Sequence, residues 1–187
     1  MKPISITVDY SIRPIEEKDL KQILEWRNSE KVHSQMLTDH KITWDEHYGW
    51  FKRMKEQTVI RNFVFEYRGV PVGYIGYTEY DEENHSCSPG AYLGIDIEAS
   101  NDAAICLFYT SIEYAFKFLG MLKLNTDVFA DNIRALKLDK FLGYEIIKEQ
   151  EHYVLKDGKK KLTYRLEIDK ARWLNHKKIL QKYLCLE

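Results

Sequence analysis

Residues 124–144 read LNTDVFADNIRALKLDKFLGY, and this stretch decides the fold. It opens with a segment that reads as a buried strand, after which Asp131-Asn132 supplies side chains that cap the start of a helix. Apolar residues at helical spacing follow. Gly143-Tyr144 then ends the helix, because glycine adopts the left-handed backbone of a helix C-terminus without strain. The stretch therefore predicts a strand, an amphipathic helix and a further strand.

Hydrophobic periodicity and turn residues predict the elements of the whole chain. Strands are expected at 5–15, 60–67, 72–80, 91–97, 124–129, 144–155 and 161–168, and helices at 16–28, 30–37, 43–57, 103–119, 132–142 and 169–184. This order of elements is typical of an α+β fold built on a sheet. Because no repeat or low-complexity linker interrupts it, we expect a single domain over residues 1–187, with 169–187 as a C-terminal helical extension.

The composition excludes several kinds of protein. A chain of 187 residues buries roughly 70% of its unfolded surface, which is enough for a substantial core. Its formal net charge of −1 gives no overall attraction to nucleic acid or to anionic membranes. No apolar run approaches the ~20 residues of a membrane-spanning helix, and the N-terminus lacks the apolar core of a signal peptide. The three cysteines and six histidines are scattered, so we expect no disulfide framework, no metal site and a cytoplasmic location.

Four motifs, in the order of the chain, resemble the GCN5-related N-acetyltransferase (GNAT) family. They are IRPIEEKDL at 12–20, WRN at 26–28 together with ITWDEHYGWF at 42–51, YLGI at 92–95, and the 124–144 stretch. The second motif is similar to a subgroup that includes the nucleotide-sugar N-acetyltransferases of pseudaminic acid biosynthesis and acetyltransferases of protein N-termini. No single motif is specific, but the four together cover roughly residues 10–150.

The resemblance implies a GNAT-type fold, a mixed and mainly antiparallel sheet of six to seven strands flanked by helices. It also implies direct transfer of an acetyl group from acetyl-CoA, the co-substrate, to a primary amine on a small molecule, with a nucleotide-linked amino sugar as the best candidate. A protein N-terminus or a small amine is the alternative acceptor, and a binding module without catalysis is the alternative to an enzyme. A monomer or homodimer is expected, without nucleic-acid or membrane partners.

Four residues are candidates for binding the acceptor substrate. Arg27 and Asn28 end the first long predicted helix, where a guanidinium suits phosphate or carboxylate oxygens and an amide adds a two-sided hydrogen-bonding group. An ion pair with a nearby glutamate and a helix C-cap are their alternative roles. Tyr74 and Tyr77 are candidates for stacking on a sugar or nucleotide, although aromatic residues on strands more often pack within the sheet.

The resemblance also assigns the acetyl-CoA contacts. The family usually binds the pyrophosphate through backbone N–H groups of a glycine-containing loop at a helix start. Asp102 departs from that pattern, since it replaces a glycine and would bring a carboxylate close to the pyrophosphate; as a helix N-cap it also has a purely structural interpretation. Either the carboxylate turns away and acetyl-CoA still binds, or this chain has altered or lost the site. The assigned contacts are Ile95, Asp96, Ile97, Asp102, Ala103, Ala104, Asn132 and Arg134.

Three residues are candidates for proton transfer. His47 titrates near neutral pH and suits relay of a proton from the attacking ammonium, or else it packs beside Trp44 and Trp50. Tyr92 occupies a position where the family often has an acidic base or a substrate-facing polar residue. Asp139 stands where the family often has a tyrosine that protonates the CoA thiolate. A carboxyl group donates a proton at neutral pH only if burial raises its pKa; otherwise Asp139 is a polar residue on a helix surface, which is what we expect.

Overall fold

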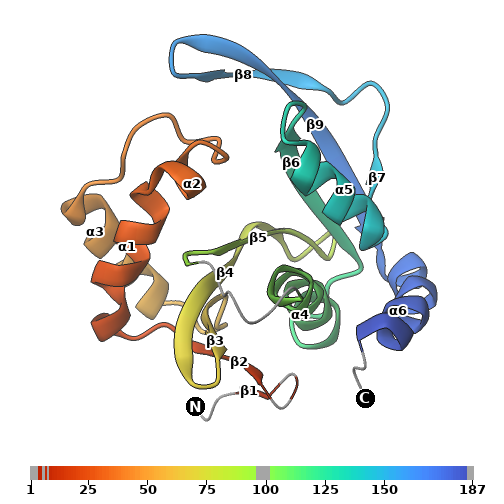
Figure 1. Ribbon diagram of the computed structural model, residues 1–187, viewed down its shortest axis with the longest axis horizontal. Coiled ribbons are helices and arrows are strands. Elements are labelled where there is room, and N and C mark those ends of the chain that lie inside the picture. The colour runs from red at the N-terminus through yellow and green to blue at the C-terminus, as the bar shows by residue number, and fades with distance from the viewer. Residues whose placement is uncertain (1–3, 6, 8, 96–101, 185–187) are drawn as a thin grey trace. The chain divides into compact units, whose positions relative to one another are not determined.

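The computed structural model describes residues 4, 5, 7, 9–95 and 102–184 of the chain (Figure 1). The chain divides into two compact units that are interleaved in sequence. Unit 1 contains residues 1–76 and 91–107, and unit 2 contains residues 77–90 and 108–187. Two strands, β4 (Val70–Asp81) and β5 (Ser86–Leu93), and one helix, α4 (Ala103–Lys117), contribute residues to both units.

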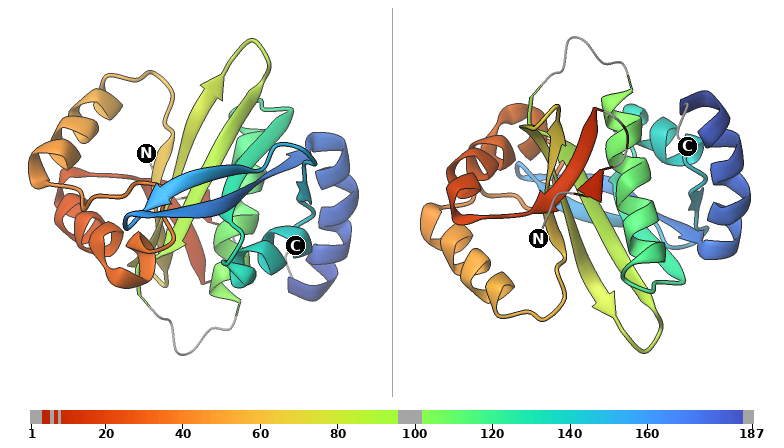
Figure 2. Two further views of the ribbon diagram at one scale, coloured as in Figure 1. Left: turned by 90° about the horizontal axis from the view of Figure 1, so that it is seen from above. Right: turned by 90° about the horizontal axis from the view of Figure 1, so that it is seen from below.

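Unit 1 consists of a small antiparallel sheet and three α-helices (Figure 2). The sheet has the order β1-β2-β3-β4, and its first three strands are antiparallel neighbours in register. The turn between β3 and β4 contains Arg68 (φ 50°) and Gly69 (φ 77°), a pair of left-handed residues that matches the twist of a tight hairpin. The elements are β1 (Ile4–Ser5), β2 (Tyr10–Pro14), the 3-10 turn η1 (Glu17–Asp19), α1 (Leu20–Asn28), α2 (Glu30–His33), α3 (Trp44–Lys55) and β3 (Asn62–Tyr67).

The core of unit 1 forms where α1 and α3 pack against β3. α3 begins at a capping box, in which Thr43 accepts a hydrogen bond from the Glu46 N–H and Glu46 bonds back to the Thr43 N–H. This capping fixes the register of α3, so that its apolar stripe faces α1 and the sheet. The buried cluster consists of Ile15, Leu20, Ile23, Trp26, Phe51 and Val64.

Unit 2 is built on β6 and β9, which pair over seven antiparallel positions from Lys123↔Asp169 to Phe129↔Thr163. The short β7 and the longer β8 both pair with β9, and β5 lies parallel to β6. Figure 1 shows β8 and β9 as a long hairpin, joined at Asp157-Gly158 with both residues at positive φ. The elements are β6 (Lys123–Phe129), α5 (Ile133–Phe141), β7 (Glu145–Ile146), β8 (His152–Lys156), β9 (Lys159–Asp169) and α6 (Lys170–Leu184).

The 124–144 stretch folds as its sequence predicts. The Asn132 side chain accepts a hydrogen bond from the Ala135 N–H and caps α5. At the other end Gly143 has φ 99°, its N–H bonds to the Lys140 carbonyl, and the Tyr144 N–H bonds to the Asp139 carbonyl. This pair of bonds is a Schellman motif, the expected use of glycine after a helix.

The α+β class and the mainly antiparallel sheet are confirmed. The two-residue strands β1 and β7 bring the strands of the described residues to nine. Two expected strands have different bounds. β5 begins at Ser86 rather than residue 91 because Pro89 and Gly90, which usually mark turns, lie inside it, and the strand expected at 144–155 is split into β7 and β8. Among the described residues, no helix combines the length and apolar character needed to cross a membrane.

Candidate functional site

The three residues of the WRN motif have three different environments in unit 1. Trp26 is buried against the end of β5, where a Cβ on Gly94 would overlap its indole ring, so only glycine fits there. Both ends of the Asn28 amide bond to the backbone of Ile42, which donates to Oδ1 and accepts from Nδ2 at 2.8 Å each. Asn28 therefore holds the segment that leads into α3, and its amide is already in use by the protein.

Arg27 has no such partner. Its Nη1 is buried and makes no hydrogen bond, and among the described residues no carboxylate forms an ion pair with the guanidinium. Burial lowers the pKa of Arg27, while Tyr74 and Tyr92 act electrostatically to raise it. A buried donor without a partner is costly, so this group needs an explanation. An anionic oxygen from a ligand would satisfy it.

Stacked aromatic rings accompany Arg27. Tyr74 stacks on Tyr92 with ring centroids 5.2 Å apart, and Trp50 meets Tyr74 edge-on at 6.4 Å. The Tyr74 hydroxyl donates to Asn62 Oδ1 at 2.7 Å, whereas the Tyr92 hydroxyl has no hydrogen-bond partner among the described residues. We call Arg27, Trp50, Tyr74 and Tyr92, together with His47, the Arg27 cluster.

The tyrosines of the Arg27 cluster remain protonated at neutral pH. Burial raises the pKa of Tyr74 and, further, that of Tyr92. A tyrosine whose pKa is raised is a hydrogen-bond donor and a poor base. Tyr92 is therefore suited to donating a hydrogen bond.

His47 is buried in the Arg27 cluster and stacks on Trp50, with centroids 5.1 Å apart. Its Nε2 donates to the Leu20 carbonyl at 3.0 Å, which leaves Nδ1 as the acceptor nitrogen. Burial lowers the pKa of His47 below its ordinary 6.5, and the bond to Leu20 offsets this only in part. The ring is therefore neutral at pH 7. The structure combines the two interpretations of His47, since it is a packed histidine that keeps one basic nitrogen.

Asp139 is the one fully buried residue of α5, all of whose residues are described. No hydrogen bond to its carboxyl group is present in the described part of the chain, and burial raises its pKa from 3.8 to about 7. The expected position on the helix surface is therefore wrong. The cause is tertiary, because Asp139 faces the core beside Tyr144, whose pKa is raised by burial and, to a smaller extent, by the Asp139 charge. At neutral pH a large fraction of Asp139 is protonated and able to donate a proton.

Other predicted residues have structural roles or exposed positions. The Tyr77 hydroxyl donates to the Ser111 carbonyl at 2.7 Å in the core of unit 2, and this bond occupies its donor. Asn132 uses its carbonyl oxygen to cap α5, and Arg134 is exposed in the first turn of that helix. Ile95 is exposed at the end of β5. Asp96 and Ile97 lie outside the described residues.

Asp102, the departure from the family pattern, is bonded inward in unit 1. Its Oδ1 accepts a hydrogen bond from the Tyr10 hydroxyl at 3.1 Å, and its Oδ2 accepts one from the Cys106 thiol at 3.8 Å. Ala103 and Ala104 follow as the first residues of α4, whose first-turn N–H groups have no partner within the helix. Of the two outcomes that the sequence left open for the carboxylate, this geometry favours the one in which it is turned aside.

The parallel ladder between β5 and β6 is short. It contains the two pairs Ser86↔Lys123 and Cys87↔Leu124, and the later residues of the two strands within unit 2 make no further ladder pairs. A parallel pair that stops after two residues leaves backbone N–H and C=O groups of both strands without strand partners.

Asp127 on β6 was missed by the sequence analysis. Its Oδ2 pairs with Arg165 at 3.0 Å, and Arg165 also pairs with Glu79 at 2.7 Å. The other carboxylate oxygen, Oδ1, is buried and has no hydrogen-bond partner. The available signal was an acidic residue inside a predicted buried strand, a combination that is rare in proteins.

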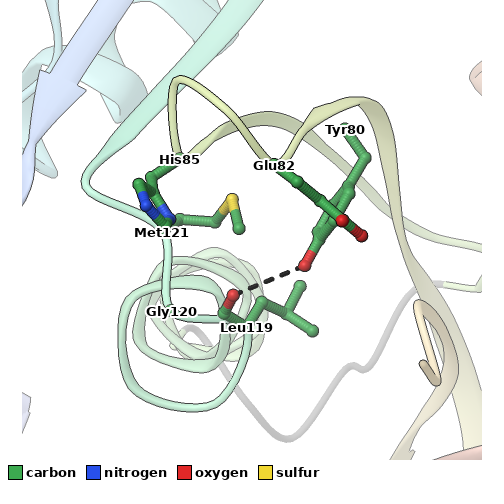
Figure 3. A pocket seen from close by; sticks show the side chains of 6 residues that line it. All are labelled: Tyr80, Glu82, His85, Leu119, Gly120 and Met121. Atoms are coloured by element: carbon green, nitrogen blue, oxygen red, sulfur yellow. Dashed lines mark hydrogen bonds between the residues drawn. The ribbon is translucent and has the colours of Figure 1, made fainter.

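A pocket of about 390 Å³ lies at another end of unit 2 (Figure 3). It is formed by the β4–β5 turn and the α4–β6 connection, where the Tyr80 hydroxyl donates to the Leu119 carbonyl. These segments adjoin the N-terminal end of β6, whereas the cap of α5 follows its C-terminal end. None of the predicted site residues lines this pocket, which is lined by Tyr80, Glu82, His85, Leu119, Gly120 and Met121.

Comparison with known proteins identifies the family. Residues 12–161 match the family described as the acetyltransferase (GNAT) domain. The chain belongs to the GNAT acetyltransferase family. The resemblance inferred from the four motifs is confirmed, and acetyl-CoA is accordingly the co-substrate of this GNAT enzyme.

Curated relatives of this GNAT enzyme include two proteins named acetyltransferase PseH, both from Campylobacter jejuni subsp. jejuni. That of serotype O:23/36 (strain 81-176) is 26% identical over 147 residues, covering 77% of this chain and 90% of the relative. That of serotype O:2 (strain ATCC 700819 / NCTC 11168) is 25% identical over 150 residues, covering 80% and 86%.

Solved structures share the fold of this GNAT enzyme. Spermidine N-acetyltransferase from Vibrio cholerae, in complex with CoA and spermine, has a TM-score of 0.81 at 18% identity and covers 90% of this chain and 100% of its own. An N-acetyltransferase from Staphylococcus aureus Mu50 has a TM-score of 0.72 at 20% identity, covering 86% and 98%. At these identities the likeness shows the fold and leaves the acceptor open.

Proposed function

We propose that this GNAT enzyme acetylates a primary amine on an anionic small molecule, with a nucleotide-linked amino sugar as the acceptor. The unpartnered Nη1 of Arg27 is the observation that carries this proposal. A half-buried guanidinium with an unpartnered nitrogen suits a phosphate oxygen of the acceptor, to which it would donate a charge-assisted hydrogen bond. The stacked rings of Tyr74 and Tyr92 suit the sugar or the base. The PseH relatives support the same acceptor class.

A polyamine acceptor fits the Arg27 cluster less well. A polyamine is a multiple cation and needs carboxylates around it, whereas the cluster contributes a cation and neutral rings. Two buried carboxylates of unit 1, Asp19 and Glu66, are already paired with Arg13 at 2.6 and 2.7 Å. A second cation would therefore meet repulsion from Arg27 without a compensating charge.

One buried acid of unit 2 suits a proton transfer of the reaction. In the transfer, the amine nitrogen forms a bond to the acetyl carbon, the carbon–sulfur bond of acetyl-CoA breaks, the nitrogen loses a proton and the sulfur gains one. We assign delivery of a proton to the sulfur to Asp139, the buried acid at the position where the family often has a tyrosine.

The test is a panel of acceptors with acetyl-CoA held constant. We expect a UDP-linked 4-amino sugar to have the highest kcat/KM, ahead of spermidine and of a peptide with a free N-terminus. Arg27→Gln removes the cation and should raise the KM for the nucleotide sugar by roughly 10- to 100-fold, the worth of a hydrogen bond to a charged group. The affinity for CoA, measured separately by calorimetry, should not change.

Arg68→Gln is the matched control, because Arg68 is exposed in the β3–β4 turn and pairs only at the surface with Asp9. It should leave the acceptor KM unchanged. A higher kcat/KM for spermidine than for the nucleotide sugar, or an Arg27→Gln variant with unchanged KM for the nucleotide sugar, would refute the proposed acceptor.

A further inference from the structure

An acidic residue, Asp102, stands at the beginning of α4. Asp102 directly precedes Ala103, and its carbonyl accepts the first helical hydrogen bond, from the Cys106 N–H at 2.8 Å. It is therefore the N-cap residue of the helix that, in a GNAT enzyme, presents its N-terminus to the pyrophosphate of acetyl-CoA. A carboxylate directed toward that anion would repel it.

Tyr10, from a distant part of the chain, holds the Asp102 carboxylate in another direction by a hydrogen bond. The Tyr10 hydroxyl donates to Asp102 Oδ1 at 3.1 Å across 92 residues of sequence. The Cys106 thiol, one helical turn after Asp102, donates to Oδ2. Both carboxylate oxygens are thus bonded within unit 1, and burial together with the Asp102 charge raises the pKa of the Cys106 thiol to about 12, which keeps the thiol proton in place as a donor.

The sheet, rather than the helix, determines where the Tyr10 hydroxyl lies. The ring is buried at the first position of β2 and stacks on Phe65 of β3, with centroids 5.2 Å apart and planes within 14°. Tyr67, its register partner on β3, packs against it at 5.3 Å. A ring held between two neighbours in a sheet has little rotational freedom, so its hydroxyl is a fixed point for the Asp102 carboxylate.

We propose that Tyr10 is a positioning residue for acetyl-CoA. Its hydroxyl, assisted by the Cys106 thiol, holds the Asp102 carboxylate away from the pyrophosphate and leaves the first-turn N–H groups of α4 to the co-substrate. Tyr10 thereby compensates for the glycine that the pyrophosphate loop lacks. The proposal rests on the use of acetyl-CoA by this GNAT enzyme and is independent of the acceptor.

The test is a double-mutant cycle read by CoA affinity in calorimetry, without acceptor or turnover. Tyr10→Phe keeps the ring and removes the donor, so we expect the Kd for CoA to rise about tenfold, as a released carboxylate comes closer to the phosphates. Asp102→Asn in the Tyr10→Phe background removes the charge and should restore the wild-type Kd. Asp102→Asn alone should change the Kd less than about threefold, because the wild-type carboxylate is already turned aside.

Two controls separate positioning from a structural role. Tyr67→Phe removes a neighbouring hydroxyl that makes no hydrogen bond in the described part of the chain, and it should leave the Kd unchanged. Acetyl-pantetheine lacks the pyrophosphate, so its kcat/KM should be the same for Tyr10→Phe and wild type. A distorted helix would instead lower kcat/KM for both acetyl donors, acetyl-CoA and acetyl-pantetheine. If Tyr10→Phe does not fold, Cys106→Ala replaces it. This variant removes the hydrogen bond to Asp102 Oδ2, keeps Tyr10 and should also raise the Kd for CoA.

The outcomes are distinct. An unchanged CoA affinity in both Tyr10→Phe and Cys106→Ala, or a loss that Asp102→Asn does not restore, overturns the proposal and leaves the co-substrate assignment standing. A wild-type protein that binds no CoA overturns the co-substrate assignment and this proposal with it.

Discussion

At the scale of single residues, each unit contains charged groups whose neighbours are unusual for their charge. Arg27 of unit 1 is a half-buried cation whose buried Nη1 has no partner. In unit 2, Asp139 is a buried acid without a hydrogen bond in the described part of the chain, and Asp127 has one bonded and one unbonded oxygen. Natural proteins rarely retain such groups without a use, because each lowers the stability of the fold.

The stability of the protein should reveal the burial of Asp139. Its pKa is about 7 in the folded protein against an ordinary 3.8, so the folded state binds more protons between these values. Stability therefore falls as the pH rises through that window. Asp139→Asn lacks this titration. We expect its free energy of unfolding, relative to that of wild type, to increase by up to about 1.4 kcal/mol per pH unit between about pH 4 and 7.

Urea unfolding at several pH values measures this difference. Asp131→Asn is the control, since Asp131 is exposed beside α5 and pairs with Lys161 at the surface. If the free energies of unfolding of Asp139→Asn and wild type differ by the same amount at low and at neutral pH, Asp139 is not buried as described.

The kinetics should show whether Asp139 delivers a proton. For wild type we expect kcat to fall as the pH rises above about 7, as the acid loses its proton. Asp139→Asn should lower kcat at pH 7 by roughly 100-fold, the lower end of what a general acid contributes, and should remove the upper limb of the pH profile. Its Kd for CoA should stay at the wild-type value. An upper limb that persists in Asp139→Asn would assign the titration to another group.

At the scale of elements, the C-terminal end of α5 determines where the candidate acid lies. The Schellman motif at Gly143 sends the chain from α5 into β7, and Arg172 of α6 donates to the Gly143 carbonyl at 2.6 Å. This turn fixes the C-terminal end of the helix whose buried residue is Asp139. The position of the candidate acid therefore depends on one glycine.

Gly143→Ala should destabilise the protein. The residue has φ 99°, and an added Cβ would lie 3.1 Å from the His176 ring. A left-handed backbone with a side chain costs roughly 1–3 kcal/mol, and chemical denaturation measures that loss. Gly49→Ala is the opposite case, because Gly49 lies inside α3 and its Cβ would make only an ordinary contact with Arg53. It should gain roughly 0.5–1 kcal/mol, and a loss similar to that of Gly143→Ala would contradict the helix-end argument.

At the scale of the whole molecule, the charge is nearly balanced, with 28 basic and 29 acidic residues. Such a chain produces little long-range attraction for an anionic acceptor. For the proposed acceptor, we therefore expect local recognition of the phosphate, at the half-buried Arg27, which solvent ions screen poorly.

Salt dependence tests this distinction. Raising the ionic strength from about 0.05 M to about 0.3 M should change the KM for the nucleotide sugar less than about fivefold. The measurement is a set of initial rates at constant acetyl-CoA. A KM that rises by two orders of magnitude would place the recognition on exposed lysines instead, and Arg68→Gln under the same conditions serves as the surface-charge control.

How far the sequence could predict the site depends on the range of the interactions involved. The capped helix, its glycine end and the α3 capping box are local patterns of a few residues, and all were predicted. The strand bounds at 91–97 failed because the turn-forming pair Pro89-Gly90 lies inside β5, where tertiary pairing overrides local preference. WRN was recognised as one motif, yet its three residues have three different roles. Trp26 packs at the end of β5, Arg27 has an unpartnered nitrogen, and Asn28 holds the segment before α3.

The sequence by itself determined the resemblance to the family and the order of most elements, because these follow from local periodicity and from short motifs along the chain. It left open whether acetyl-CoA still binds. Only the tertiary structure decided the environments of Asp102 and Asp139. Asp102 accepts a hydrogen bond from a tyrosine 92 residues away, and Asp139, expected on a helix surface, is buried. The physical reason is that the pKa and direction of a charged group depend on burial and on partners distant in sequence, which no local pattern contains.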